Sequence, residues 1–262
     1  MKLSISNIGW DAKKDIGIYK LMQRYGYSGL EIAPTRVFEE KPYDKREQAK
    51  QWSEGLQKKY GFEISSMQSI WFGRNEKLFG SSQEREVLID YTKKAIDFAS
   101  AVGCHNLVFG CPRNRFFSKG ADWSIGVAFF KKIGDYAFSK GTVIGMEANP
   151  PIYNTNFIND TKSALELIEE VDSQGYLLNL DVGTMIQNNE SIDVLYNKIK
   201  WINHIHISEP NLKPIQQRKL HGELCAFLKE NMYQNFISIE MGKIEDMEQM
   251  EKIMQYVQEV FG

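Results

Sequence analysis

The feature that most constrains this chain is a phrase that returns five times along it: an amphipathic helical pattern, a glycine, and then a short apolar run. A helix commonly ends on a left-handed residue, and glycine adopts that conformation without a Cβ clash. The phrase therefore predicts helices that end at a glycine and lead directly into strands. It occurs as "MQRYGYSGLEI", "QKKYGFEISSM", "ASAVGCHNLVFG", "AFSKGTVIGME" and "VDSQGYLLNLD", with Gly26, Gly61, Gly103, Gly141 and Gly175 at the junctions.

The segments before these glycines carry the 3.6-residue periodicity of helices that pack on one face. Residues 159–161, Asn-Asp-Thr, offer N-cap side chains for the helix that follows them. The clearest apolar stripe lies in residues 85–103 and consists of Leu88, Tyr91, Ala95, Phe98 and Val102, with charged side chains opposite.

Eight strands are predicted, and a helical pattern follows most of them. Strands that alternate with helices predict a parallel sheet, and eight such units in 262 residues fit an α/β (β/α)8 TIM barrel with outer helices. An open doubly wound sheet is the alternative, but no GxGxxG follows the first strand. No linker divides the chain, so we expect residues 1–262 to form a single domain. The predicted strands are 2–6, 29–33, 63–68, 106–110, 142–147, 176–181, 202–207 and 236–240.

Charge and composition limit the classes of partner. A net charge of −2 gives no basic surface for a nucleic-acid backbone. No run of 18 apolar residues and no apolar segment of signal-peptide length is present, so no membrane partner is expected. Cys104, Cys111 and Cys225 form no CxxC pattern, which favours a reducing compartment. We therefore expect a cytoplasmic protein whose partner is a small molecule.

Polar residues recur at the ends of the last four predicted strands, one in each unit. Glu147, Asp181, His206 and Glu240 are separated by 34, 25 and 34 residues. Each shares a strand face with small or polar residues, while aliphatic residues occupy the other face. In a barrel the polar face points inward, and active sites lie at the carboxyl ends of the strands. The four side chains are therefore expected to meet.

Such a cluster predicts a bound cation. A single carboxylate at a strand end is more often solvated or paired with a basic side chain, but three buried together are costly without compensation. A divalent ion removes that cost. Three carboxylates and one imidazole form a hard, oxygen-rich ligand set that suits Mn²⁺ or Mg²⁺, with Co²⁺ or Zn²⁺ as alternatives.

The motifs "GLEI", "GMEANP", "LNLDVGT", "HIHISEP" and "SIEMG" give the whole chain a resemblance to a known family. It resembles the xylose isomerase-like TIM barrel superfamily, which contains sugar phosphate isomerases and epimerases and AP endonuclease family 2-like enzymes. The resemblance implies that Glu147, Asp181, His206 and Glu240 bind one divalent metal, commonly Mn²⁺. It also implies a metal-dependent isomerase or epimerase of carbohydrate metabolism that acts on a sugar or sugar phosphate. Proton abstraction next to a carbonyl would give a metal-stabilised enediolate, with Glu147 and Glu240 as catalytic acid and base.

The chain departs from the family pattern at two places. Thr184 stands where the family often has the histidine of Asp-x-Gly-His, which puts the usual substrates in doubt. The extra histidines of the endonuclease IV-type trinuclear zinc site are also missing, and Gln68 follows the third predicted strand instead. With no basic patch, a DNA-repair function is not expected.

Three other functions are alternatives for a barrel of this kind. A metal-dependent dehydratase of an inosose- or dehydroshikimate-type substrate begins with the same proton abstraction. A non-catalytic relative is a further alternative, because the Thr184 departure could mark lost activity. A class I aldolase needs a lysine inside the barrel, and no strand end carries one. The resemblance also leaves a homo-oligomer open.

Several loop residues are candidates for binding the substrate, each with a structural alternative. The tryptophans could stack on a sugar or belong to the core, and the arginines could bind an anion or remain solvated. His204 is expected to be a core histidine rather than a ligand. The candidates are Trp10, Glu31, Gln68, Trp71, Arg113, Arg115, Glu209 and His221.

Overall fold

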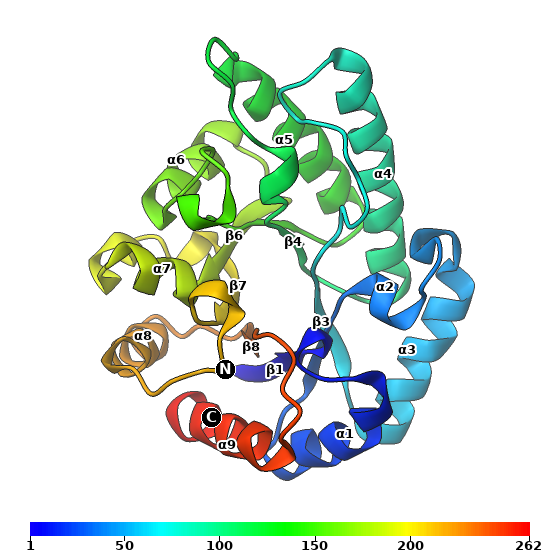
Figure 1. The fold of residues 1–262 in the computed structure, drawn as a ribbon, viewed down its shortest axis with the longest axis vertical. Helices are drawn as coiled ribbons and strands as arrows, with labels where there is room; N and C mark the ends of the chain where they lie inside the picture. The colour runs from blue at the N-terminus through cyan, green and yellow to red at the C-terminus, as the bar shows by residue number, and fades with distance from the viewer.

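The computed structural model describes residues 1–262 and shows a closed barrel of eight parallel strands in the order β1 to β8. Figure 1 shows the strands around the centre and the helices outside them. The predicted (β/α)8 architecture is confirmed. The strands are β1 (Lys2–Ser6), β2 (Gly29–Ile32), β3 (Glu63–Met67), β4 (Leu107–Phe109), β5 (Ile144–Met146), β6 (Tyr176–Asp181), β7 (Ile202–Ile207) and β8 (Phe236–Ile239).

Nine α-helices accompany the strands. The unexpected element is α2, a single turn that begins at a proline, a residue well suited to a first helical position. The helix after β6 is only seven residues long, which explains the weak helical pattern in that part of the sequence. The helices are α1 (Asp15–Arg24), α2 (Pro34–Val37), α3 (Arg46–Tyr60), α4 (Ser82–Ala101), α5 (Trp123–Ser139), α6 (Thr161–Val171), α7 (Val182–Asn188), α8 (Lys219–Glu230) and α9 (Met247–Phe261).

Four of the five predicted junction glycines adopt a left-handed conformation, with φ of 71° at Gly26, 78° at Gly61, 69° at Gly103 and 74° at Gly141. The prediction is wrong for Gly175. There α6 ends earlier and Asp172 is the left-handed residue, with φ of 47°. A Cβ on Gly175 would collide with the backbone of α5. This glycine therefore permits α5 to pack closely against the start of β6.

The two faces of the strands have different environments. Outward aliphatic residues such as Ile205 and Ile239 are fully buried beneath the helices. Inside the barrel, polar side chains bind one another: the amide of Asn106 donates to Ser66 at 2.9 Å and to Asn179 at 3.3 Å. The alternation predicted for the last four strands thus separates an apolar layer from a polar interior. No helix of the structure has the length and apolar character needed to cross a membrane.

Candidate functional site

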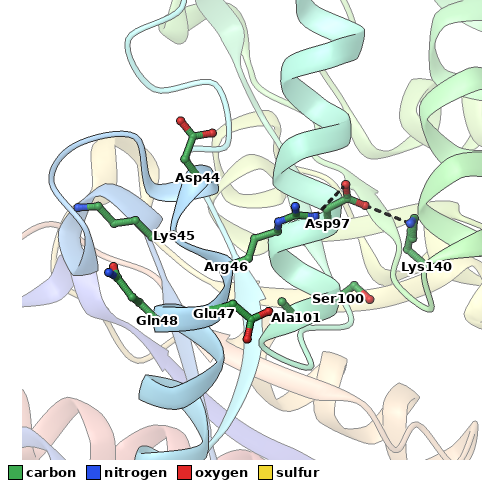
Figure 2. Close-up of a pocket in the computed structure, with 9 residues that line it drawn as sticks. All are labelled: Asp44, Lys45, Arg46, Glu47, Gln48, Asp97, Ser100, Ala101 and Lys140. Atoms are coloured by element: carbon green, nitrogen blue, oxygen red, sulfur yellow. Dashed lines mark ion pairs between the residues drawn. The ribbon is translucent and has the colours of Figure 1, made fainter.

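A cavity of about 190 Å³ opens at the carboxyl ends of the strands. Glu147, Asp181 and Glu240 line it, as do Gln68 and Glu209. A larger hollow lies on the outer wall between α3 and α4 (Figure 2), where Arg46 and Lys140 both pair with Asp97. None of its charged residues comes from a strand end. The cavity at the strand ends is therefore the candidate active site.

The four predicted ligands meet at this cavity, where three of them line it and the fully buried His206 contacts two of these carboxylates. One donor atom from each of Glu147, Asp181, His206 and Glu240 lies within 4.8 Å of the others. The centre of the group is the buried imidazole of His206, whose Nδ1 lies 3.0 Å from Glu147 Oε1 and 3.2 Å from Glu240 Oε2. Strands β5, β6, β7 and β8 thus direct their last inward side chains to one point.

Each of the two glutamates is also held from outside the cluster by an amide. Asn179 Nδ2 donates to Glu147 Oε1 at 3.0 Å, and Gln68 Nε2 donates to Glu240 Oε1 at 3.1 Å. These contacts fix the carboxylates in rotamers that face His206.

Asp181 is held by the first turn of α7. Its Oδ1 accepts the backbone N–H of Thr184 at 2.6 Å, and its Oδ2 accepts the hydroxyl of Ser208. The Thr184 hydroxyl donates to the carbonyl of Ala148 at 2.9 Å and is buried. Thr184 therefore acts here as a structural residue that supports Asp181.

Glu31 lies behind His206 and does not line the cavity, so its predicted contact with a substrate is not supported. It is fully buried, and its Oε2 lies 2.8 Å from His206 Nε2 and 3.1 Å from His204 Nε2. Burial opposes ionisation of Glu31, but His206 and His204 outweigh it and lower the pKa of this carboxyl. An ionised carboxylate only accepts hydrogen bonds, so both Nε2 atoms donate and His206 Nδ1 faces the cavity.

The electrostatics of the cluster favour a cation at its centre. Burial, aided by Glu147, raises the pKa of Asp181 to about 6, and burial raises the pKa of Glu240 to about 7. Burial also disfavours a charged His206, yet Glu240 and Glu31 outweigh it and raise the pKa of the imidazole. Protons are thus retained where carboxylates crowd together. Three carboxylates and one imidazole nitrogen that attract positive charge fit a divalent ion.

A buried arginine supports Glu147 from the loop after β4. Arg115 is inaccessible to solvent and donates from Nη2 to the Glu147 carbonyl at 3.0 Å and to Asn149 Oδ1 at 2.8 Å. Asn149 in turn donates to Glu147 Oε2 at 3.2 Å. Arg115 therefore has neither of the two roles that the sequence left open, an anion-binding arginine or a solvated one. Its side chain turns into the protein because buried carbonyl oxygens there need donors.

Four other candidates do not line the cavity. Trp10 is buried and donates to Asp15 at 2.7 Å, and Trp71 is buried and donates to Thr92 at 2.8 Å. The structure therefore gives both tryptophans a packing role. His221 also has a packing role, since it is buried and its Nδ1 lies 2.9 Å from the Tyr256 hydroxyl. Arg113 is exposed, which matches the solvated alternative for this residue.

Residues that the sequence did not single out complete the cavity wall. Tyr153 and Leu212 belong to one-turn 3₁₀ segments that follow β5 and β7. The Tyr153 hydroxyl accepts the backbone N–H of Asn211 at 2.9 Å, which joins the two segments at the mouth. Nothing periodic marks such loop residues. Only the phrase "GMEANPPIY" places Tyr153 close after a predicted ligand.

The fold and this site define a (β/α)8 barrel with a cluster of carboxylates and histidine at the carboxyl ends of its strands. The chain matches the family described as xylose isomerase-like TIM barrel over residues 19–260 and belongs to that family. A comparison with curated proteins gives no match.

Solved structures similar to this chain include several enzymes of sugar chemistry. D-psicose 3-epimerase from Clostridium cellulolyticum, solved with D-tagatose, is 15% identical with a TM-score of 0.81, covering 100% of this chain and 99% of its own. The 3-keto-D-glucoside 4-epimerase from E. coli is 16% identical with a TM-score of 0.76, covering 99% of each chain. A probable 3-DHS dehydratase from Bacillus anthracis is 15% identical with a TM-score of 0.69, covering 99% of this chain and 98% of its own. At these identities the similarity establishes the fold.

Proposed function

We propose that this chain is a divalent-metal-dependent isomerase or epimerase of a sugar or sugar phosphate. The observation that carries the proposal is the pair of carboxylates, Glu147 and Glu240, that face His206 Nδ1 from β5 and β8 inside one cavity. Two carboxylates at one small site provide a base to remove a proton and an acid to return it. Family membership supports the same class of reaction.

Glu147, Asp181, His206 and Glu240 would hold the metal, for which we expect Mn²⁺, with Mg²⁺, Co²⁺ or Zn²⁺ as alternatives. A divalent ion bound there would supply positive charge that polarises the substrate carbonyl and acidifies the neighbouring C–H group. Glu31 holds the His206 ring through Nε2, so its orientation does not depend on a ligand.

Glu147 and Glu240 carry the proton transfer. One carboxylate takes the proton from the carbon next to the carbonyl, and the other delivers a proton to complete the reaction. Return to the opposite face of the same carbon is epimerisation, whereas transfer to the adjacent carbon is aldose–ketose isomerisation. General acid–base catalysis of this kind typically contributes about 10²–10⁴-fold to the rate. Asn179 and Gln68 hold these carboxylates in position during the transfer.

The test is to measure the metal content of the purified chain and deuterium incorporation into ketoses in D₂O. We expect about one metal ion per chain in the wild type, and much less in Glu240→Gln and His206→Ala. Glu147→Gln and Glu240→Gln should slow deuterium incorporation by about 10²-fold or more. The control is Glu63→Gln, because Glu63 pairs with Lys2 at the start of β3, at the opposite end of the barrel.

Two results would contradict the proposal. If no metal is bound and no divalent ion raises the melting temperature, the metal site is wrong. If a hydroxyl group is lost instead of a proton being returned, product analysis by NMR identifies a dehydratase.

A further inference from the structure

The cavity at the strand ends offers acidic and neutral polar groups to a ligand, and no lysine or arginine lines it. Its volume of about 190 Å³ is smaller than the roughly 300–1,000 Å³ of pockets for drug-sized ligands, so its ligand is small. The polar side chains of its wall are Gln68, Ser69, Glu147, Asn149, Tyr153, Asp181, Ser208, Glu209 and Glu240.

Three arginines that neighbour wall residues in the sequence or in space do not line the cavity, and two of them are paired within the protein. Arg218 forms two hydrogen bonds with the buried carboxylate of Glu209, at 2.9 Å from Nε and 2.6 Å from Nη2. Arg115 is enclosed behind Glu147 and donates to protein oxygens. Arg113 is exposed and outside the wall. No guanidinium is therefore free to bind a phosphate or carboxylate in the cavity.

Backbone N–H groups do not provide an anion-binding site in place of the missing lysine and arginine side chains. In (β/α)8 barrels phosphate often binds N–H groups at helix starts near the last strands, where the helix dipole favours an anion. Here a side-chain oxygen accepts one such N–H group at the start of α7 and of α9, whereas the start of α8 has no side-chain cap and does not line the cavity. Asp181 accepts from Thr184 at the start of α7, and Asp246 accepts from Glu248 at 2.9 Å at the start of α9.

The segment that leads into α8 is occupied in the same way. Glu209 accepts the N–H of Gln216 at 3.2 Å, and the Tyr256 hydroxyl accepts the N–H of Arg218 at 3.1 Å. These two backbone N–H groups thus already have acceptors within the protein.

The charge of the loaded site also disfavours an anion. The carboxylates of Glu147, Asp181 and Glu240 outweigh a divalent ion by one negative charge when His206 is neutral. Arg218 does no more than balance Glu209. An anionic group buried away from the ion would lose its hydration without gaining a cationic side chain as a partner. Hydroxyl groups, by contrast, can donate to carboxylate and amide oxygens, and the Tyr153 hydroxyl, which already accepts from Asn211, can donate to them.

We infer that the substrate is an uncharged polyhydroxy ketone of monosaccharide size, without a phosphate or carboxylate group. This inference rests on the proposed function and narrows it, because sugar phosphates and carboxylate-bearing dehydratase substrates are excluded. Uncharged cyclic polyols remain compatible with the wall.

The experiment compares matched pairs of compounds on the Mn²⁺-loaded full chain. D-fructose is paired with D-fructose 6-phosphate, and D-ribulose with D-ribulose 5-phosphate. NMR in D₂O follows deuterium incorporation next to the carbonyl, and calorimetry measures binding of the same compounds. We expect kcat/KM for the uncharged member to exceed that for its phosphorylated partner by about tenfold or more, equivalent to at least about 1.4 kcal/mol.

A matched variant tests whether charge is the cause of the discrimination against phosphorylated sugars. Glu209→Gln removes the charge that neutralises Arg218, and this should reduce the discrimination against the phosphorylated sugar several-fold. Equal discrimination in variant and wild type would overturn the assignment of Glu209 and Arg218 as its source.

The remaining outcomes separate this inference from the proposed function. A phosphorylated sugar that reacts or binds as well as its uncharged partner would overturn the inference and leave the proposed function intact. Binding of the uncharged member without deuterium incorporation would support the substrate class and contradict the proposed reaction. Failure of every uncharged sugar both to bind and to react would overturn both.

Discussion

Glu31 lies in β2 and faces two histidines of β7 inside the barrel. From the sequence alone, a substrate contact and a structural role such as a salt bridge were both open for it. In the barrel it is fully buried and holds the Nε2 atoms of His206 and His204, while its Oε1 has no partner. A carboxylate that binds the far nitrogen of a ligand histidine fixes the ring and increases its basicity. Glu31 is thus a positioning residue.

Glu31→Gln tests this role. The amide keeps the shape of the side chain but loses the charge that orients and polarises His206. We expect the affinity for Mn²⁺ to fall by about 10–100-fold, measured by competition with a chelating dye. Circular dichroism should show an intact fold, and Glu63→Gln serves as the exposed control. Unchanged Mn²⁺ affinity in a folded variant would exclude a positioning role.

The residues that the sequence placed correctly in the cavity follow strand periodicity. Alternation along β5 to β8 determines that Glu147, Asp181, His206 and Glu240 point inward, and the structure brings them together. Their role as metal ligands stays a prediction. Periodicity does not extend into loops, where the path of the backbone determines which way a side chain points. The sequence therefore left a stacking role and a packing role open for Trp10 and Trp71, and the packing role is the one observed, because their indole N–H groups bind Asp15 and Thr92 within the protein.

At the scale of elements, the approach of β4 to β5 places a strict limit on side-chain size. Gly110 follows β4, and a Cβ there would lie 2.8 Å from Glu147 Oε2 and 3.4 Å from Asn149 Oδ1. Gly110→Ala should therefore displace the Glu147 carboxylate. Because a misplacement of about 1 Å can cost about 10²-fold in rate, we expect kcat/KM to fall by about that factor. Steady-state kinetics measures the loss, and thermal unfolding should show a much smaller change in stability.

Gly55 provides the matched control within a helix. It lies exposed in the middle of α3 with no atom within 4 Å of an added Cβ. Gly55→Ala should stabilise the fold by about 0.5–1 kcal/mol, because alanine loses less backbone entropy in a helix, and should leave kcat/KM unchanged. Equal effects of the two substitutions on activity would show that Gly110 is not needed for the position of Glu147.

Helices and strands could be predicted from the sequence where a repeated local pattern determines them. Their lengths and close contacts could not, because tertiary packing determines those. The repeated helix–glycine–strand phrase predicts the closed barrel, because each unit must bury an apolar face against the next. The short length of β4 follows instead from limited pairing, since β3 and β4 share the single register pair Met67 and Leu107. Gly175 also satisfies a helix–strand contact that the local sequence does not reveal.

At the scale of the whole molecule, the acidic cluster at one end of the barrel couples the free energy of unfolding to pH and to metal binding. The pKa values of Asp181 and Glu240 are raised to about 6 and about 7 from ordinary values of 3.8 and 4.5. The folded state therefore binds these protons more tightly than the unfolded state. Their stabilising contribution is present at low pH and is lost as pH rises through about 4 to 7.

A divalent ion requires the deprotonated carboxylates, so its stabilisation should increase over the same pH range. We expect the Mn²⁺-induced rise in melting temperature to be small at about pH 5 and to grow up to about pH 7. Buried His204 and His221 have lowered pKa values, and their effect on stability has the opposite sign. His221 lies outside the cluster, whereas His204 contacts Glu31 beside it, so the difference between loaded and chelator-treated protein reports the cluster together with His204. The Asp181→Asn/Glu240→Gln double variant should show no such pH-dependent difference. A Mn²⁺ effect that is constant from about pH 5 to 7 in the wild type would show that these carboxylates do not bind the ion.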